Sequence, residues 1–124
     1  MARLMLVEAS EALRIGLSMI FSLDKSLEIV AETDGAADVM QLVAQHTPDV
    51  VVIDVDMHDG DDTLAQLTQV APHLRVIVLT IRPSHVEHQR LVDLGAFACI
   101  EKRASPQDLL NAVQAASTVV RASQ

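Results

Sequence analysis

Five short runs rich in Val, Ile and Leu divide the chain, and they constrain its fold more than any other feature. The runs cover residues 4–7, 27–31, 50–53, 76–79 and 97–100. Each run has the length of a strand, and the segments between them carry apolar residues at helical spacing. Strands that alternate with helices in this way indicate a parallel sheet, because each crossover is long enough to hold a helix and must be right-handed.

The runs are continuously apolar rather than alternating, which is typical of strands covered on both faces. We therefore predict a doubly wound α/β fold, with a five-stranded parallel sheet between two layers of helices. A length of 124 residues fits one domain. We place that domain at residues 1–118, and we interpret residues 119–124 as a tail or as the start of a linker to a further domain.

Local signals set the ends of the predicted helices. The first helix begins after Ser10. The second covers residues 36–46 and ends before Thr47-Pro48, because a residue that precedes proline is pushed out of the helical region. The third covers residues 63–70. Ser84 and Ser105 open the fourth and fifth, since each precedes an acid by three residues and can accept from an unpaired backbone N–H.

Charge and composition exclude several classes of protein. With 17 acidic and 9 basic side chains the net charge is -8, so the chain should be repelled by a nucleic-acid backbone. A single cysteine rules out an internal disulfide. No segment approaches the roughly 18 consecutive apolar residues of a membrane span, and the N-terminus does not resemble a signal peptide. We expect a soluble cytoplasmic protein without a membrane partner.

Four polar residues lie just beyond the ends of different apolar runs. They are Glu8, Asp54, Thr80 and Lys102. In an open α/β sheet, ligands bind beyond the carboxyl ends of the strands, near the point where the strand order reverses. The predicted fold therefore gathers two acids, a hydroxyl and an ammonium at one edge, although they are spread along nearly the whole sequence.

Over essentially its full length the chain resembles the receiver domain of response regulators, and four stretches carry the resemblance. LMLVEAS is similar to the family's acidic first loop, PDVVVIDVDMHDGD to its phosphoacceptor strand, RVIVLT to its switch strand and GAFACIEKRASPQDLL to its lysine region. The last stretch most resembles receivers that precede a helix-turn-helix DNA-binding domain. The resemblance implies a flavodoxin-like three-layer sandwich with strand order 2-1-3-4-5.

The same resemblance implies a function in two-component signalling. Asp54 would accept a phosphoryl group from the phosphohistidine of a sensor histidine kinase, with Glu8, Asp54 and the backbone carbonyl of Asp56 holding Mg²⁺. Lys102 would neutralise the phosphoryl oxygens, and Thr80 would hydrogen-bond one of them. The chain would then be no enzyme beyond assisting its own phosphorylation. Its output would be transcriptional, with DNA bound only by a separate effector domain, and a homodimer is a further expectation.

The sequence departs from the family pattern at the metal site. Receivers usually carry two adjacent acids after the first strand, whereas this chain has Glu8 followed by Ala9. Loss of one carboxylate should weaken Mg²⁺ binding, and we hypothesise that the side chain of Asp56 helps to compensate. This departure also supports an alternative function, a degenerate receiver that acts as an interaction module without being phosphorylated.

Three further departures concern the switch and the access to Asp54. Cys99 stands where many receivers have Tyr or Phe, so it cannot swing an aromatic ring inward. His58 replaces a common proline, and Ile81 replaces a small residue and is predicted to crowd the acceptor.

A calcium loop is a poor alternative for the aspartate-rich segment. Asp59 stands where such a loop requires glycine, and Ala65 stands where the bidentate Glu belongs. Asp59 and Gly60 are interpreted instead as a turn, and Asp61 and Asp62 as helix-start residues. A nucleotide or flavin site is also disfavoured, because the turn EAS after the first strand lacks glycines that could hold a phosphate.

Overall fold

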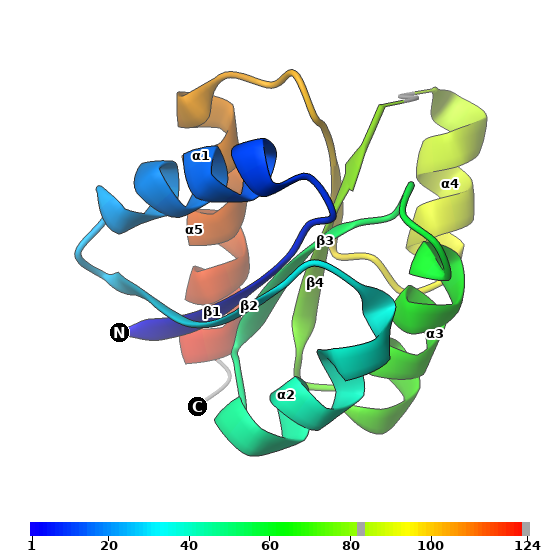
Figure 1. Cartoon of the computed structure of the whole chain (residues 1–124), viewed down its shortest axis with the longest axis horizontal. Coiled ribbons are helices and arrows are strands. Elements are labelled where there is room, and N and C mark those ends of the chain that lie inside the picture. The colour runs from blue at the N-terminus through cyan, green and yellow to red at the C-terminus, as the bar shows by residue number, and fades with distance from the viewer. Residues whose placement is uncertain (82–83, 123–124) are drawn as a thin grey trace.

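The computed structural model describes residues 1–81 and 84–122 and contains the predicted five-stranded parallel sheet, in the order β2-β1-β3-β4-β5 (Figure 1). The order and direction confirm the doubly wound prediction. The strands are β1 (Ala2–Val7), β2 (Leu27–Thr33), β3 (Val50–Asp54), β4 (Arg75–Thr80) and β5 (Ala98–Glu101).

Helices cover both faces of this sheet (Figure 1). They are α1 (Glu11–Ser22), the short 3-10 helix η1 (Ala36–Asp38), α2 (Val39–His46), α3 (Gly60–Val70), α4 (His85–Asp93) and α5 (Pro106–Ala122). One apolar cluster joins α1 and α5 to the sheet, with Phe21 fully buried in it. A second cluster joins α2, α3 and α4 to the opposite face. The core is therefore two-sided, as the continuous apolar runs predicted, and it is aliphatic apart from Phe21.

Serine caps begin three helices where the sequence placed them. The side chain of Ser10 accepts from the N–H of Leu13, and Ser84 accepts from the N–H of Glu87. Ser105 likewise accepts from the N–H of Asp108, at a distance of 3.1 Å. Each bond satisfies a donor that the first helical turn leaves unpaired.

The third helix begins three residues earlier than predicted. Asp59 adopts a left-handed conformation with φ of 60°, and α3 starts at the next residue, Gly60. A Cβ at Gly60 would overlap the backbone of Val55, so the tight return of the chain after β3 requires glycine. Gly60 is therefore the first residue of α3 rather than part of the turn, and Asp61 and Asp62 lie in the first helical turn, as expected.

Two other boundaries differ in detail. The segment predicted as one helix over residues 36–46 is split into η1 and α2, and it ends with Thr47 in the left-handed region at φ of 46°. At the C-terminus, α5 continues through residues 119–122 of the predicted tail. Over the part of the chain that the structure describes, no helix is both long and apolar enough to cross a membrane.

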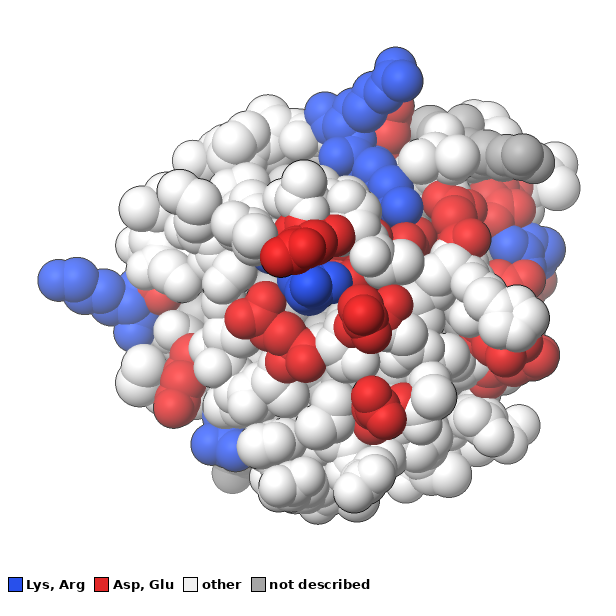
Figure 2. Space-filling model, in the orientation of Figure 1, with Lys and Arg blue, Asp and Glu red and all other residues white. Residues whose placement is uncertain are grey.

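Charged side chains on the face viewed in Figure 2 are mainly acidic, and the basic ones are scattered among them. This arrangement agrees with the net charge of -8. The surface in this view offers no match to a phosphate backbone.

Candidate functional site

The carboxyl edge of the sheet brings together three of the four predicted side chains in direct contact. The Lys102 Nζ atom lies 2.9 Å from Asp54 Oδ1 and 3.6 Å from Glu8 Oε1. Glu8 and Asp54 are 1% and 3% exposed, so two carboxylates share one ammonium in a nearly dry site. Thr80 ends β4 beside them and is 2% exposed.

Asp54 and Lys102 form the best-satisfied part of the site. The Asp54 Oδ1 atom accepts both from Lys102 and, at 3.0 Å, from the backbone N–H of Asp56. Burial alone lowers the pKa of Lys102, but the hydrogen bond and charge of Asp54, together with Glu8 and Asp56, outweigh burial and raise it. The lysine is therefore a permanent cation beside the candidate acceptor.

The Glu8 carboxylate has a hydrogen-bond partner on only one of its two oxygens. Its Oε2 atom accepts from the N–H of Ser10 at 2.9 Å, whereas its Oε1 atom is buried without a hydrogen-bond partner. Burial raises the pKa of Glu8, the Ser10 hydrogen bond opposes this, and the neighbouring Asp54 carboxyl raises the pKa further. A buried, unpaired carboxylate oxygen is costly, and a cation is the group that would satisfy it.

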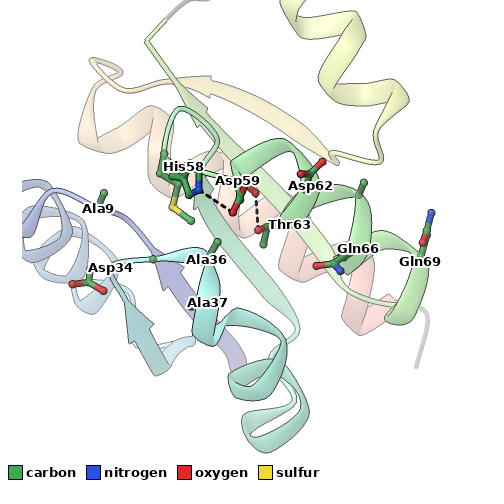
Figure 3. Close-up of a pocket in the computed structure, with 13 residues that line it drawn as sticks. Ala9, Asp34, Ala36, Ala37, His58, Asp59, Asp62, Thr63, Gln66 and Gln69 are labelled. Carbon is green, nitrogen blue, oxygen red and sulfur yellow. Dashed lines mark hydrogen bonds and ion pairs between the residues drawn. The ribbon is translucent and has the colours of Figure 1, made fainter.

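Ala9 is exposed and faces a hollow beside Glu8. The hollow has a volume of about 830 Å³ and lies between the loops after β1 and β2 and one side of α3 (Figure 3). His58 and Asp59 lie along its rim, 3.2 Å apart through His58 Nε2 and Asp59 Oδ2. The methyl group of Ala9 leaves room here for a larger side chain.

The donors at this edge fit a hard divalent cation in kind but not in number. Glu8 and Asp54 supply carboxylate oxygens, and the unpaired Glu8 oxygen is the observation that favours a cation. Residues 1–81 and 84–122 hold no cluster of three His, Cys, Asp or Glu side chains that could bind a metal by itself. A backbone carbonyl and waters would have to complete the shell, as is usual for Mg²⁺.

Asp56 makes a contact that the sequence did not suggest. Its Oδ2 atom accepts from the backbone N–H of Ile81 at 2.8 Å, which joins the loops after β3 and β4. One oxygen of the carboxylate is thus bonded to Ile81, and the hypothesis that this side chain helps the metal site stays a prediction. No local pattern signals such a bond, because its partners are 25 residues apart and meet only in the folded sheet.

The three remaining departures are placed as follows. Cys99 is partly buried and lines a second cavity of about 510 Å³ with Leu91 and Ile100. Burial and the charge of Glu87 raise the pKa of the Cys99 thiol, so it is a weakly reactive side chain. Ile81 is 58% exposed, and the side chain of His58 is 95% exposed.

Comparison with known families and curated proteins agrees with this geometry. Residues 4–114 match the family model described as the response regulator receiver domain. The nitrate/nitrite response regulator protein NarP of Escherichia coli is 30% identical over 115 residues, which are 91% of this chain and 54% of that protein. The response regulator protein VraR of Staphylococcus aureus is 27% identical over 93% of this chain and 56% of its own. The chain thus spans about half the length of these relatives.

Solved structures show the same fold. The receiver domain of the response regulator NarL from Mycobacterium tuberculosis superposes with a TM-score of 0.87 at 23% identity, covering 94% of this chain and 96% of that one. A CheY-like receiver domain from Methanospirillum hungatei gives a TM-score of 0.88 at 18% identity, over 100% and 99% of the two chains. At these identities the likeness supports the fold alone.

Proposed function

The chain belongs to the response regulator receiver domain family, and from this premise we propose that Asp54 accepts a phosphoryl group from a sensor histidine kinase and thereby switches a transcriptional output. The observation that carries the assignment is the buried pair of Asp54 and Lys102, 2.9 Å apart, with the unpaired oxygen of Glu8 beside it. Receiver domains of response regulators act with such kinases, and the curated relatives named above are response regulators.

In the proposed transfer, an Asp54 oxygen forms a bond to phosphorus while the bond from phosphorus to the kinase histidine breaks. The departing imidazole keeps the bonding electron pair and takes up a proton. Both hydrogen bonds to the Asp54 carboxylate converge on Oδ1, so we assign the attack to Oδ2. Burial of the site excludes water that would compete for the phosphoryl group.

In this proposal Lys102 and Thr80 contact the oxygens of the phosphoryl group on Asp54. The Lys102 ammonium needs only to pass from Asp54 Oδ1 to a phosphoryl oxygen, which offsets negative charge without a large movement. The Thr80 hydroxyl, at the buried end of β4, would donate to another oxygen and draw the following loop inward. A divalent cation held by Glu8, Asp54 and the Asp56 carbonyl would supply further positive charge when bound.

Intact-mass measurement tests the proposal directly. The protein is incubated with a small phosphoryl donor and Mg²⁺ and compared with Asp54→Asn. We expect one added phosphoryl mass on the wild type and none on the variant. Absence of label on the wild type at high Mg²⁺ would contradict the proposal, and equal labelling of both would move the acceptor elsewhere.

The wider setting of the domain is part of the same proposal. Because the relatives are about twice as long, we assign DNA binding to a separate effector domain and no catalytic turnover to this one. A homodimer through α1, where Ile15 and Met19 are 53% and 67% exposed, is a prediction that sedimentation of the phosphorylated protein tests. The alternative of a degenerate receiver finds no support in these matches.

A further inference from the structure

The side chain of Asp56 joins two loops that border the candidate site. Its backbone N–H donates to Asp54 Oδ1 at 3.0 Å, which ties the residue to the candidate acceptor. From that position its Oδ2 atom accepts from the N–H of Ile81 at 2.8 Å. One residue is therefore bonded to the acceptor strand and to the first residue after β4.

The position of Ile81 gives this bond a consequence for the site. Ile81 follows Thr80, the last residue of β4, so its N–H lies at the same edge of the sheet as the candidate acceptor. The charge of Asp56 also reaches this edge, because it is among the groups that raise the pKa of Lys102. Asp56 thus places a negative charge and an acceptor close to the place where a phosphoryl group on Asp54 would lie.

A second link lies nearby, between α3 and α4, and joins side chains only. Arg90 of α4 pairs with Asp61 of α3 at 2.6 Å, but the two side chains are 42% and 49% exposed. Ion pairs exposed to this degree contribute about 0–1 kcal/mol and are screened by salt. The Arg90–Asp61 pair does not involve the backbone after β4, whereas the Ile81 bond to Asp56, although also exposed, acts on that backbone directly.

Resting on the proposed function, we propose that the Asp56 carboxylate is a positioning group that holds the Ile81 N–H in the unphosphorylated domain and is displaced when Asp54 is phosphorylated. A phosphoryl group adds roughly 1.5 to 2 negative charges and strong acceptor oxygens. It therefore repels the Asp56 carboxylate and competes with it for donors on the same edge. The Ile81 N–H, directly after Thr80, then has two states, one bonded to Asp56 and one released toward the phosphoryl group.

The bond itself is tested by nuclear magnetic resonance of the unphosphorylated protein. In Asp56→Ala we expect the Ile81 amide proton to exchange with solvent faster and to shift upfield, whereas Asp56→Asn keeps an acceptor oxygen and retains most of the protection. Asp62→Ala is the matched control, since it removes an exposed carboxylate from the first turn of α3. An Ile81 amide that is unchanged in Asp56→Ala overturns the proposal.

Phosphorylation kinetics test the displacement. At saturating Mg²⁺ we expect Asp56→Ala to be labelled several-fold faster than wild type and Asp62→Ala to be unchanged; a Mg²⁺ titration separates this from an altered metal affinity. Equal maximal rates in Asp56→Ala and wild type overturn the displacement step. If no variant is labelled, the proposed function fails together with displacement, while the amide measurement still decides whether Asp56 positions the loop.

Discussion

Two halves of the candidate site differ in how completely the protein satisfies them. The phosphoryl half consists of Asp54 and Lys102, whose contact of 2.9 Å joins opposite charges. The cation half consists of Glu8 and Ala9, where one buried carboxylate oxygen has no hydrogen-bond partner and the neighbouring residue offers only a methyl group. The first half is internally paired, whereas the second leaves one buried oxygen without a hydrogen bond.

The difference shows that one lysine hydrogen-bonds only one of the two buried carboxylates. Lys102 lies 3.6 Å from Glu8 Oε1, beyond hydrogen-bond distance, because its ammonium is bonded to Asp54. The pKa of Glu8 is correspondingly raised by burial. Glu8 is therefore the side chain of this edge that a bound cation would satisfy, and its burial is unfavourable without one.

The largest expected effect comes from breaking the phosphoryl half. Lys102→Met removes the cation that would offset phosphoryl charge, so we expect the labelling rate to fall by about 10²- to 10³-fold. Apparent Mg²⁺ affinity should not fall, because a competing positive charge is gone. Lys25→Met is the matched control, since Lys25 is exposed and is the other lysine of the chain. A labelling rate in Lys102→Met equal to that of wild type would show that Lys102 does not offset the phosphoryl charge.

The next effect comes from completing the cation half. Ala9→Asp adds a carboxylate beside Glu8, where the hollow of about 830 Å³ leaves room, so Mg²⁺ should bind more tightly. We expect about a tenfold gain, equivalent to about 1.4 kcal/mol. Calorimetric titration measures the affinity, and Ala9→Asn is the uncharged control of similar size. Equal affinities in both variants would mean that charge at this position does not limit binding.

A smaller effect is expected on stability when the buried acid of the cation half is neutralised. The folded-state pKa of Glu8 is raised above its ordinary value of 4.5. Between pH 4.5 and the raised pKa, the folded protein therefore binds more protons than the unfolded chain. Wild-type stability therefore falls as pH rises from the ordinary value through the raised pKa. At pH 7 without metal we expect Glu8→Gln to be more stable than wild type by about 1 kcal/mol.

Urea unfolding followed by circular dichroism measures this difference, since the chain has no Trp. The advantage of Glu8→Gln should disappear below pH 4.5. Glu28→Gln, at an exposed position of β2, should show no such pH dependence. A Glu8→Gln protein that is less stable than wild type at pH 7 would mean that the glutamate is satisfied in the unliganded fold.

The smallest effect is expected outside both halves. Arg90→Ala removes exposed ion pairs to Asp61 and Glu87, so stability should change by less than about 1 kcal/mol, and the change should shrink as salt is added. Labelling rate and Mg²⁺ affinity should stay at wild-type values. A large loss of either would place the contact between α3 and α4 within the site.

Local sequence patterns predicted most of the fold because they act over a few residues. The serines at positions 10, 84 and 105 accept from N–H groups three residues on, so their helix starts were predictable. The start of α3 was missed because it depends on the left-handed turn at Asp59 and on the close approach of Gly60 to Val55. That approach is a tertiary contact between the end of β3 and the helix, which propensity does not encode.

For the site, the sequence by itself determined which side chains end the strands, since strand order and alternating helices bring Glu8, Asp54, Thr80 and Lys102 to one edge. Only the tertiary structure decided how they are used: that Lys102 bonds Asp54 rather than Glu8, and that the Asp56 carboxylate holds the Ile81 N–H. These choices depend on burial and on distances between separate loops. A one-dimensional pattern fixes where a residue lies along a strand, whereas the packing of the whole sheet sets the direction and the partner of its side chain.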